Sequence, residues 1–321
     1  MCYTDYMNQP KTLMEATRYF SDPDVALEFM VKLRWPNGVA CPACGCLGAG
    51  FLKTRRIWKC RDCGKQFSVK VGTIFEDSPI SIDKWLCAIW MISNCKIGVS
   101  SYEIHRALGV TQKTAWFMLH RIRLALQNGT VETVKGTIEA DETYIGGKAG
   151  NMHYAERMAR NEIHGSRGSA GKAVVFGMLE RGGRVEAKVI KRADQKTAQA
   201  NLLKHVDGHA KLFTDEHGSY ANMSFYFSHS VIHHATQYVK DNVHTNGIEN
   251  FWSLLKRGLK GTYVSVEPYH LGSYVAEQVF RFNLRKENDA TRFMTAASQI
   301  VGLRLTYAEL TGKVLATGAR A

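Results

Sequence analysis

Two C-x2-C pairs, Cys41 with Cys44 and Cys60 with Cys63, constrain the fold of this chain more than any other feature. Fifteen residues separate the pairs, a spacing that is typical of a four-cysteine structural zinc site. Four thiolates leave no open coordination position, so we expect this Zn²⁺ to hold structure and not to catalyse. Cys46 lies outside the pattern but could compete as a ligand. Four unrelated buried cysteines are the alternative interpretation.

Basic residues gather around these cysteines. Positions 51–70 carry seven Lys or Arg residues against one acid, Asp62. The whole chain has 42 Lys and Arg against 29 Asp and Glu, a formal charge of +13 that favours a polyanionic partner. Six of these bases are predicted to contact DNA phosphates, with Trp58 and Phe67 interleaved: Lys53, Arg55, Arg56, Lys59, Arg61 and Lys65. A solvated hairpin edge is the alternative.

A helix-turn-helix is predicted after the cysteine segment. Helices are expected at Pro23 to Lys32, Ile82 to Asn94, Ser100 to Leu108 and, capped by Thr111, as far as Leu126. Gly109 makes the turn, with Ile104, Leu108 and Val110 packed inside. The last helix would present three side chains to the major groove: Gln112, Lys113 and Arg121. A plain helical packing unit is the alternative.

Short apolar strands mixed with helices follow in the second half. Strands are expected at Thr137 to Tyr144, Ala173 to Leu179, Val185 to Ile190, Leu212 to Thr214 and Ser230 to Ile232. Helices are expected at Thr197 to Val206, Ile248 to Gly258 and Pro268 to Arg285. This order predicts a mixed α/β domain. The basic, Gly-rich segment between Gly146 and Lys172 is expected to be a mobile loop.

Three carboxylates stand where acids are unexpected: Asp141 in a strand, Asp215 where a strand meets a loop, and Glu249 early in a helix. Such a set can bind two Mg²⁺ (or Mn²⁺) ions, which stabilise both oxygens of an in-line phosphoryl displacement. Taken singly, each acid could instead cap a turn or be solvated. Glu139 and Glu142 flank Asp141 and are expected to face the other way. Three histidines are alternative metal ligands: His233, His234 and His244.

The sequence resembles a bacterial insertion-sequence transposase of the DDE class, in the group with an N-terminal zinc ribbon. The resemblance covers about residues 20–288 and rests on the ribbon and on four segments. These are IEADETYIG from Ile138, Thr214 with Asp215, HTNGIENFWSLLKRGLKGTY from His244, and RFNLR from Arg281. The segment from His244 is the most specific of them.

The resemblance implies an RNase H-like catalytic domain in which Asp141, Asp215 and Glu249 are the metal-binding triad. Lys256, seven residues after Glu249, would reach a phosphate beside the metals. Asn246 is a possible alternative to Glu249, because some relatives use Asn in that role. Two more bases of this segment are predicted DNA contacts: Arg257 and Lys260. The metals would activate water to nick DNA, and the freed 3′-hydroxyl would then attack the target.

The expected architecture is a multidomain α+β or α/β chain. The N-terminal helix and zinc ribbon would occupy residues 1–75, the helix-turn-helix 76–130, the catalytic domain 131–288 and a C-terminal tail 289–321. The expected partners are double-stranded DNA, as the terminal inverted repeats of the element and as target, and further copies of the chain in a homodimer or larger oligomer.

No membrane partner is expected, because no stretch approaches the roughly 18 apolar residues of a spanning helix. The N-terminus does not look like a secretory signal. A cytoplasmic, nucleoid-associated bacterial protein is therefore expected. A zinc-ribbon regulator with an inactive RNase H-like domain is the alternative function, and a nuclease that cuts without joining is a third.

Overall fold

The computed structural model describes residues 10–127, 133–147, 152–164, 169, 171–232 and 243–313. The chain divides into two compact units. The first joins Met1–Asn128 with Leu284–Ala321, and the second is Gly129–Asn283. The C-terminal segment, for which the sequence suggested no role, therefore belongs with the N-terminal half.

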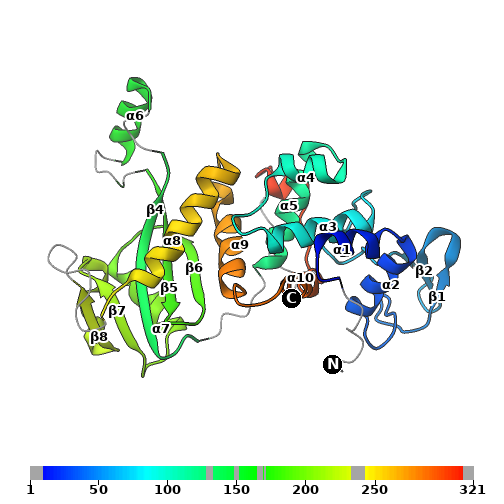
Figure 1. Ribbon diagram of the computed structural model, residues 1–321, viewed down its shortest axis with the longest axis horizontal. Helices are drawn as coiled ribbons and strands as arrows, with labels where there is room; N and C mark the ends of the chain where they lie inside the picture. The colour runs from blue at the N-terminus through cyan, green and yellow to red at the C-terminus, as the bar shows by residue number, and fades with distance from the viewer. Residues whose placement is uncertain are drawn as a thin grey trace. The chain divides into compact units, whose positions relative to one another are not determined.

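The first unit contains helices and one small sheet (Figure 1). The helices are α1 (Leu13–Phe20), α2 (Pro23–Arg34), α3 (Ile82–Asn94), α4 (Ser101–Leu108), α5 (Gln112–Leu126), α10 (Asp289–Ser298) and α11 (Tyr307–Leu310). The antiparallel sheet has the order β1 (Ala49–Leu52), β2 (Ile57–Cys60), β3 (Gln66–Phe67), with the short turn η2 (Lys53–Arg55) between β1 and β2.

Local capping signals set the helix ends where the sequence predicted them. Asp22 accepts a hydrogen bond from the Asp24 amide, with Pro23 at the first helical position of α2. Ser100 and Glu103 form a reciprocal capping box at the start of α4. Thr111 caps α5. The predictions of α2, α3, α4 and α5 are confirmed to within two residues, whereas α1 was not predicted.

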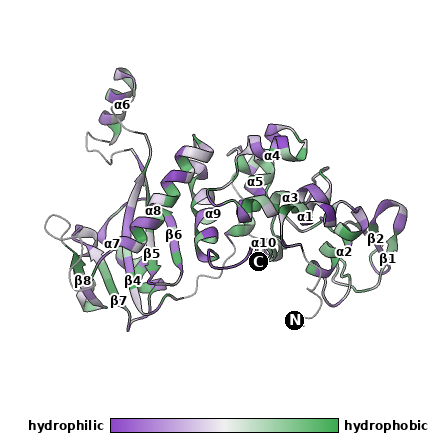
Figure 2. Ribbon diagram, viewed as in Figure 1, coloured by the Kyte–Doolittle hydropathy of each residue, from purple (hydrophilic) through white to green (hydrophobic). Residues whose placement is uncertain are grey.

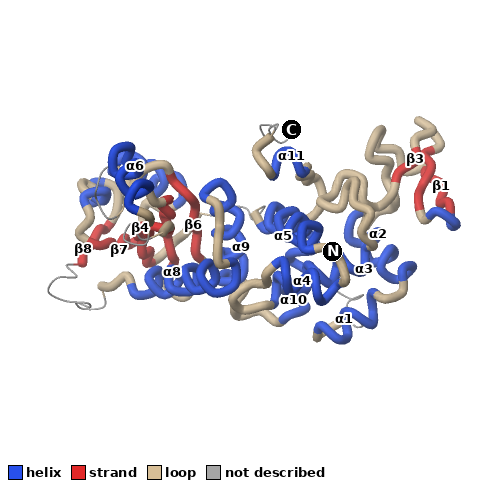
Figure 3. The backbone as a smooth tube through the Cα atoms, turned by 90° about the horizontal axis from the view of Figure 1, so that it is seen from above, coloured by secondary structure: helices blue, strands red, loops and turns tan. Residues whose placement is uncertain are grey.

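Aromatic side chains join segments of the first unit that lie far apart in sequence. Phe293 of α10 packs against Phe20 and Trp90, with ring centroids 5.7 and 5.0 Å apart. All three rings are buried. Figure 3 shows α10 among the helices of this unit. The chain thus returns from the second unit to complete the core of the first.

The second unit is built on a five-stranded sheet with the order β6–β5–β4–β7–β8. Its strands are β4 (Thr137–Ile145), β5 (Ala173–Glu180), β6 (Val185–Ile190), β7 (Lys211–Asp215) and β8 (Ser228–Ile232). β4, β5 and β6 form an antiparallel meander, β7 pairs parallel to β4, and β8 pairs parallel to β7. This mixed sheet has the RNase H-like topology, so the predicted fold class is confirmed.

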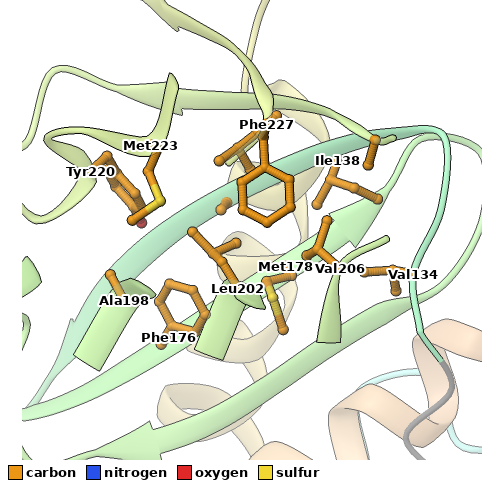
Figure 4. Close-up of a cluster of buried hydrophobic side chains, with 13 residues drawn as sticks. Val134, Ile138, Phe176, Met178, Ala198, Leu202, Val206, Tyr220, Met223 and Phe227 are labelled. Carbon is orange, nitrogen blue, oxygen red and sulfur yellow. The ribbon is translucent and has the colours of Figure 1, made fainter. Parts of the chain in front are cut away.

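Each face of this sheet carries its own core. One core lies against α7 (Gln195–His205), η4 (Gly218–Tyr220) and η5 (Met223–Phe225), and Figure 4 shows its members, including Ile138, Phe176 and Leu202. The other lies against α8 (Asn246–Gly258) and α9 (Leu271–Asn283). The π-helical turn η6 (Leu259–Tyr263) and the turn η7 (Pro268–His270) connect these two helices. In Figure 2, α8 carries hydrophilic and hydrophobic residues in alternation, as its half-buried position requires.

One prediction about this unit was wrong. The segment between Gly146 and Lys172, expected to be a mobile loop, contains the helix α6 (Tyr154–His164). The glycines on either side favoured a loop, although the segment contains an eleven-residue amphipathic sequence, YAERMARNEIH. Across the described part of the chain, no helix combines the length and apolarity needed to cross a membrane.

Candidate metal centre and active site

The four cysteines of the two C-x2-C pairs come together at one end of the small sheet. Their sulfurs all lie within 4.8 Å of one another, with Cys41 3.7 Å from Cys63 and Cys44 3.6 Å from Cys60. A tetrahedral site with Zn–S bonds of about 2.3 Å has edges of about 3.8 Å, so these distances fit Zn²⁺. The site is therefore that of a structural zinc ion.

Two glycines turn the backbone around this site. Gly45 and Gly64 have φ of +77° and +70°, and their amides donate to the carbonyl oxygens of Cys41 and Cys60. A residue with a Cβ atom is strained in this left-handed region, which explains glycine after each second cysteine. Cys46 is not part of the cluster, and its sulfur accepts a hydrogen bond from the Gly48 amide.

The six predicted DNA-contacting bases of this ribbon are all exposed. Arg56 forms an ion pair of 2.7 Å with Asp24 of α2. Arg55 donates to the side chain of Gln66. The interleaved Trp58 and Phe67 are buried and stack on each other with centroids 6.1 Å apart, so they form the core of the ribbon.

The helix-turn-helix segment folds as two helices joined at Gly109, with Ile104 and Val110 buried and Leu108 half-buried. Lys113 is exposed, and its ammonium lies 4.8 Å from the centre of the Tyr307 ring of α11. Gln112 is half-buried and donates to Ser101.

The prediction that Arg121 points outward was wrong. Its side chain is 5% exposed. The guanidinium donates hydrogen bonds to the carbonyl oxygens of Ile74, Glu76 and Leu305. Position 121 faces the segment before α3 and the C-terminal segment, so Arg121 joins three parts of the first unit. The sequence pattern gave no sign of the C-terminal segment lying there.

Asp141 and Asp215 lie on neighbouring parallel strands. The pairing of β4 with β7 sets Glu139 opposite Phe213, two residues before Asp141 and Asp215 on their strands, and the charge of Asp215 acts on Asp141. Burial and the charge of Asp215 raise the pKa of Asp141 to about 7. Two carboxylates that repel each other in a partly buried position fit a divalent cation, which neutralises both.

Trp252 of α8 reaches this strand. Its indole N–H donates a 2.9 Å hydrogen bond to Oδ2 of Asp141. The indole occupies the space over Gly177, which pairs with Asp141 across β5 and β4. A Cβ atom on Gly177 would lie 2.6 Å from Cη2 of Trp252. Trp252 was predicted as a packing residue only. It is buried, and it also binds the acid.

Glu249 and Lys256 lie on the exposed flank of α8 beside Trp252. Seven residues amount to about two helical turns, so the two side chains lie within about 20° of each other around the axis. Oε1 of Glu249 accepts a hydrogen bond from the Thr245 hydroxyl. Asn246 is also exposed, about 60° further from Trp252 than Glu249 is.

The three acids do not converge as the cysteines do. Of the described residues, the four cysteines alone form a metal-ligand group with all ligand atoms within 4.8 Å. Asp141 accepts a hydrogen bond from Trp252 of α8, Glu249 from the N-cap residue Thr245, and Asp215 from the amide of His217. The alternative ligand His244 lies 3.3 Å from Glu139, while His233 and His234 lie outside the described residues.

Glu142 occupies the opposite face of β4. Its carboxylate accepts a 3.0 Å hydrogen bond from the Ser219 hydroxyl. Burial raises its pKa. Burial and the charges of Glu142 and Asp141 raise the pKa of Tyr220 well above its ordinary value. Glu142 therefore faces away from Trp252, as predicted, but lies close enough to Asp215 for their charges to interact.

The prediction for Glu139 was wrong, because residues two apart in a strand share a face. Glu139 lies on the α8 side of β4, as Asp141 does, and is 1% exposed. It binds Arg181 and the amide of Ile248. The two-residue periodicity of strands was the signal that could have found it.

Comparison with known protein families adds an independent observation. Residues 133–283 match the model of an ISXO2-like transposase domain, which is nearly the whole of the second unit. Residues 21–66 match a transposase zinc-ribbon domain and include all four cysteines of the cluster. The two ranges together span well over half of the chain.

The chain combines an ISXO2-like transposase domain with a transposase zinc ribbon. The resemblance to zinc-ribbon transposases of insertion sequences is thereby confirmed. This transposase is also 26% identical over 272 residues to an uncharacterized protein in transposable element ISH50 of Halobacterium salinarum. That match covers 80% of this chain and 91% of the relative.

Proposed function

We propose that this transposase binds the ends of its insertion sequence and catalyses metal-dependent strand cleavage and strand transfer of DNA. Asp141, Asp215 and Glu249 would hold two Mg²⁺ or Mn²⁺ ions. The observation that carries the proposal is the closeness of Asp141 and Asp215 on paired parallel strands, together with the burial and charge repulsion that raise the pKa of Asp141 to about 7. Carboxylates with raised pKa values in such a position are typical of functional sites.

Two bound divalent ions would lower the pKa of the attacking water and would stabilise negative charge on the attacking and leaving oxygens. Asp141 and Asp215 would help to hold these ions, because their oxygens come from adjacent strands. Glu249 would complete the set from α8 by releasing the Thr245 hydroxyl. Its place next to Trp252 around the helix favours Glu249 over Asn246 as the third ligand.

Lys256 would bind a phosphate next to the metals, since it lies about two helical turns beyond Glu249 on the same flank of α8. Arg257 and Lys260 are exposed on the same helix and its π-helical extension, and would bind the DNA backbone. These bases leave α8 cationic toward its C-terminal end, where a helix favours positive charge.

The zinc ribbon and the α4–α5 pair would bind the element ends. The six exposed bases in and around η2 and β2 would contact phosphates, and Gln112 and Lys113 would lie near the groove. Arg121 is left out of this proposal, since its donors bind carbonyl oxygens. Joining two element ends requires at least two active sites, so we propose a homodimer or larger assembly on DNA.

A joining assay tests the proposal. The substrate is a labelled duplex that carries the imperfect inverted repeat flanking the coding region, either intact or already nicked at the end. We expect cleavage and joining in Mg²⁺ with the natural chain, and neither with Asp141→Asn or Asp215→Asn at equal DNA binding. Cleavage without joining would indicate a nuclease, and end binding without cleavage by the natural chain would indicate a regulator.

A further inference from the structure

The buried carboxylate of Glu139 joins the strand that bears Asp141 to the helix that bears Glu249. Oε2 accepts a 3.0 Å hydrogen bond from the amide of Ile248, the third residue of α8. The first amides of a helix have no partner within the helix. Thr245, the N-cap residue, makes no side-chain cap bond, and its hydroxyl donates to Glu249. Glu139 therefore caps α8 from another element.

The other carboxylate oxygen of Glu139 binds cationic and polar groups from two further segments. Oε1 accepts a 2.8 Å charge-assisted hydrogen bond from Nε of Arg181, in the turn between β5 and β6. Nδ1 of His244 lies 3.3 Å from the same oxygen. Arg181 also donates to the carbonyl oxygen of His244, just before α8. The buried carboxylate of Glu139 thus contacts both the first turn of α8, at Ile248, and the residue His244 just before the helix.

Close approach of the two backbones depends on Gly247. A Cβ atom there would lie 2.7 Å from Oε2 of Glu139 and 3.0 Å from Cδ2 of Leu179. Glycine is thus the residue that lets the Glu139 carboxylate reach the Ile248 amide. The helix N-terminus, with its partial positive charge, also stabilises the anion that it receives.

The spacing of two contacts aligns α8 along β4. Glu139 binds the Ile248 amide and Asp141 binds the Trp252 indole. Two residues of a strand span about 6.6 Å and four residues of a helix about 6 Å, so both contacts can form at once. Glu249 lies between these two attachment points.

We infer that Glu139 is a positioning residue, which sets Glu249 at the distance from Asp141 that the metal ions require. It does so through the backbone of α8 and is not itself a metal ligand, because its two oxygens are bound to Arg181 and Ile248. The inference rests on the proposed function of the acids. It extends that function to a residue with no direct contact to metal or DNA.

The test measures Mn²⁺ affinity by electron paramagnetic resonance, without DNA, on the full chain and on Glu139→Gln. Outer-shell variants commonly cost 10- to 100-fold in metal affinity, so we expect at least a tenfold loss. We also expect the Mg²⁺ concentration that cleavage needs to rise by a similar factor. Replacing Mg²⁺ with Mn²⁺ should partly restore cleavage. Leu202→Ala, in the core on the opposite face of the sheet, is the control for lost stability alone.

Equal Mn²⁺ affinity in Glu139→Gln and the natural chain would overturn the inference, as would an equal loss in Leu202→Ala. If Glu139→Gln does not fold, Arg181→Lys replaces it, with a smaller loss of affinity expected and an unchanged affinity contradicting the claim. Failure of the proposed function is distinguishable, because the natural chain would then bind Mn²⁺ no better than Asp141→Asn.

Discussion

The indole N–H of Trp252 donates a 2.9 Å hydrogen bond to Oδ2 of Asp141, which links α8 to the central strand of the sheet. The bond favours the ionised carboxylate and lowers the pKa of Asp141, against the larger opposing effects of burial and Asp215. Trp252 therefore favours the anionic form of Asp141, which is the form that a cation would bind. Trp252 thus both packs in the core and donates a hydrogen bond to an acid.

Trp252→Phe should raise the pKa of Asp141 further, because the ring stays but the N–H donor is lost. A hydrogen bond to a charged group contributes roughly 1.5 kcal/mol, so metal-dependent cleavage should need a pH about one unit higher. The measurement is cleavage against pH at fixed Mg²⁺. Trp85→Phe is the matched control, since it also loses an indole bond, to Ser78 in the first unit. An identical shift in both variants would refute the assignment.

The raised pKa of Asp141 should make the metal-free protein less stable as the pH increases. The native pKa is about 7 against an ordinary value of 3.8, so the native state retains a proton that the unfolded chain releases between these values. This contribution is lost as the pH rises through 7, and it amounts to at most about 4 kcal/mol. Mg²⁺ should restore stability at pH 8.

Urea unfolding of the natural chain and of Asp141→Asn from pH 5 to 8 measures this effect. The difference between their free energies of unfolding isolates Asp141 from all other titrating groups. We expect the natural chain to lose stability relative to the variant across this range. Parallel curves without metal would mean that Asp141 titrates at its ordinary pKa.

Gly177→Ala should disturb the site without touching any acid. The new Cβ atom would lie 2.6 Å from the Trp252 ring, so the indole must move away from Asp141. Overpacking of this kind costs roughly 1–3 kcal/mol, and we expect weaker Mg²⁺ activation with it. Gly208→Ala, which meets no atom within 4 Å, should leave both stability and activation unchanged. Thermal unfolding and cleavage assays measure the two effects.

The zinc ribbon should lose its metal when any of the four clustered cysteines is changed. We expect about one zinc ion per natural chain by atomic absorption and clearly less with Cys60→Ser, because three thiolates leave the tetrahedral site incomplete. Cys46→Ser should retain zinc fully, since Cys46 lies outside the cluster. Zinc loss in Cys46→Ser alone would show that the cluster has been assigned wrongly.

Much of the fold could be predicted because its signals are local. Asp22 with Pro23, Ser100 with Glu103, and Thr111 each cap a helix through neighbours a few residues away. Strand limits follow from apolar runs, as in β5 and β6. The helix α6 was missed because the glycines before and after it favoured a loop for the whole segment.

The features that could not be predicted depend on segments that meet only in three dimensions. Arg121 is buried because residues near 74 and 305 supply its acceptors. The role of Trp252 depends on the absence of a side chain at Gly177, on another strand. For Glu139, the alternation of side chains along a strand predicts the face on which it lies. Its hydrogen-bond partners, Arg181 and the amide of Ile248 in α8, could not be predicted from the sequence.

The most direct test of the account counts the metal ions that the acids hold. Mn²⁺ titration of the zinc-loaded chain, followed by electron paramagnetic resonance, should reveal two bound ions per chain that Mg²⁺ displaces. Asp141→Asn and Asp215→Asn should each bind at most one and lose cleavage in the same samples. If either variant binds as many Mn²⁺ ions as the natural chain, Asp141 and Asp215 do not hold the catalytic metals.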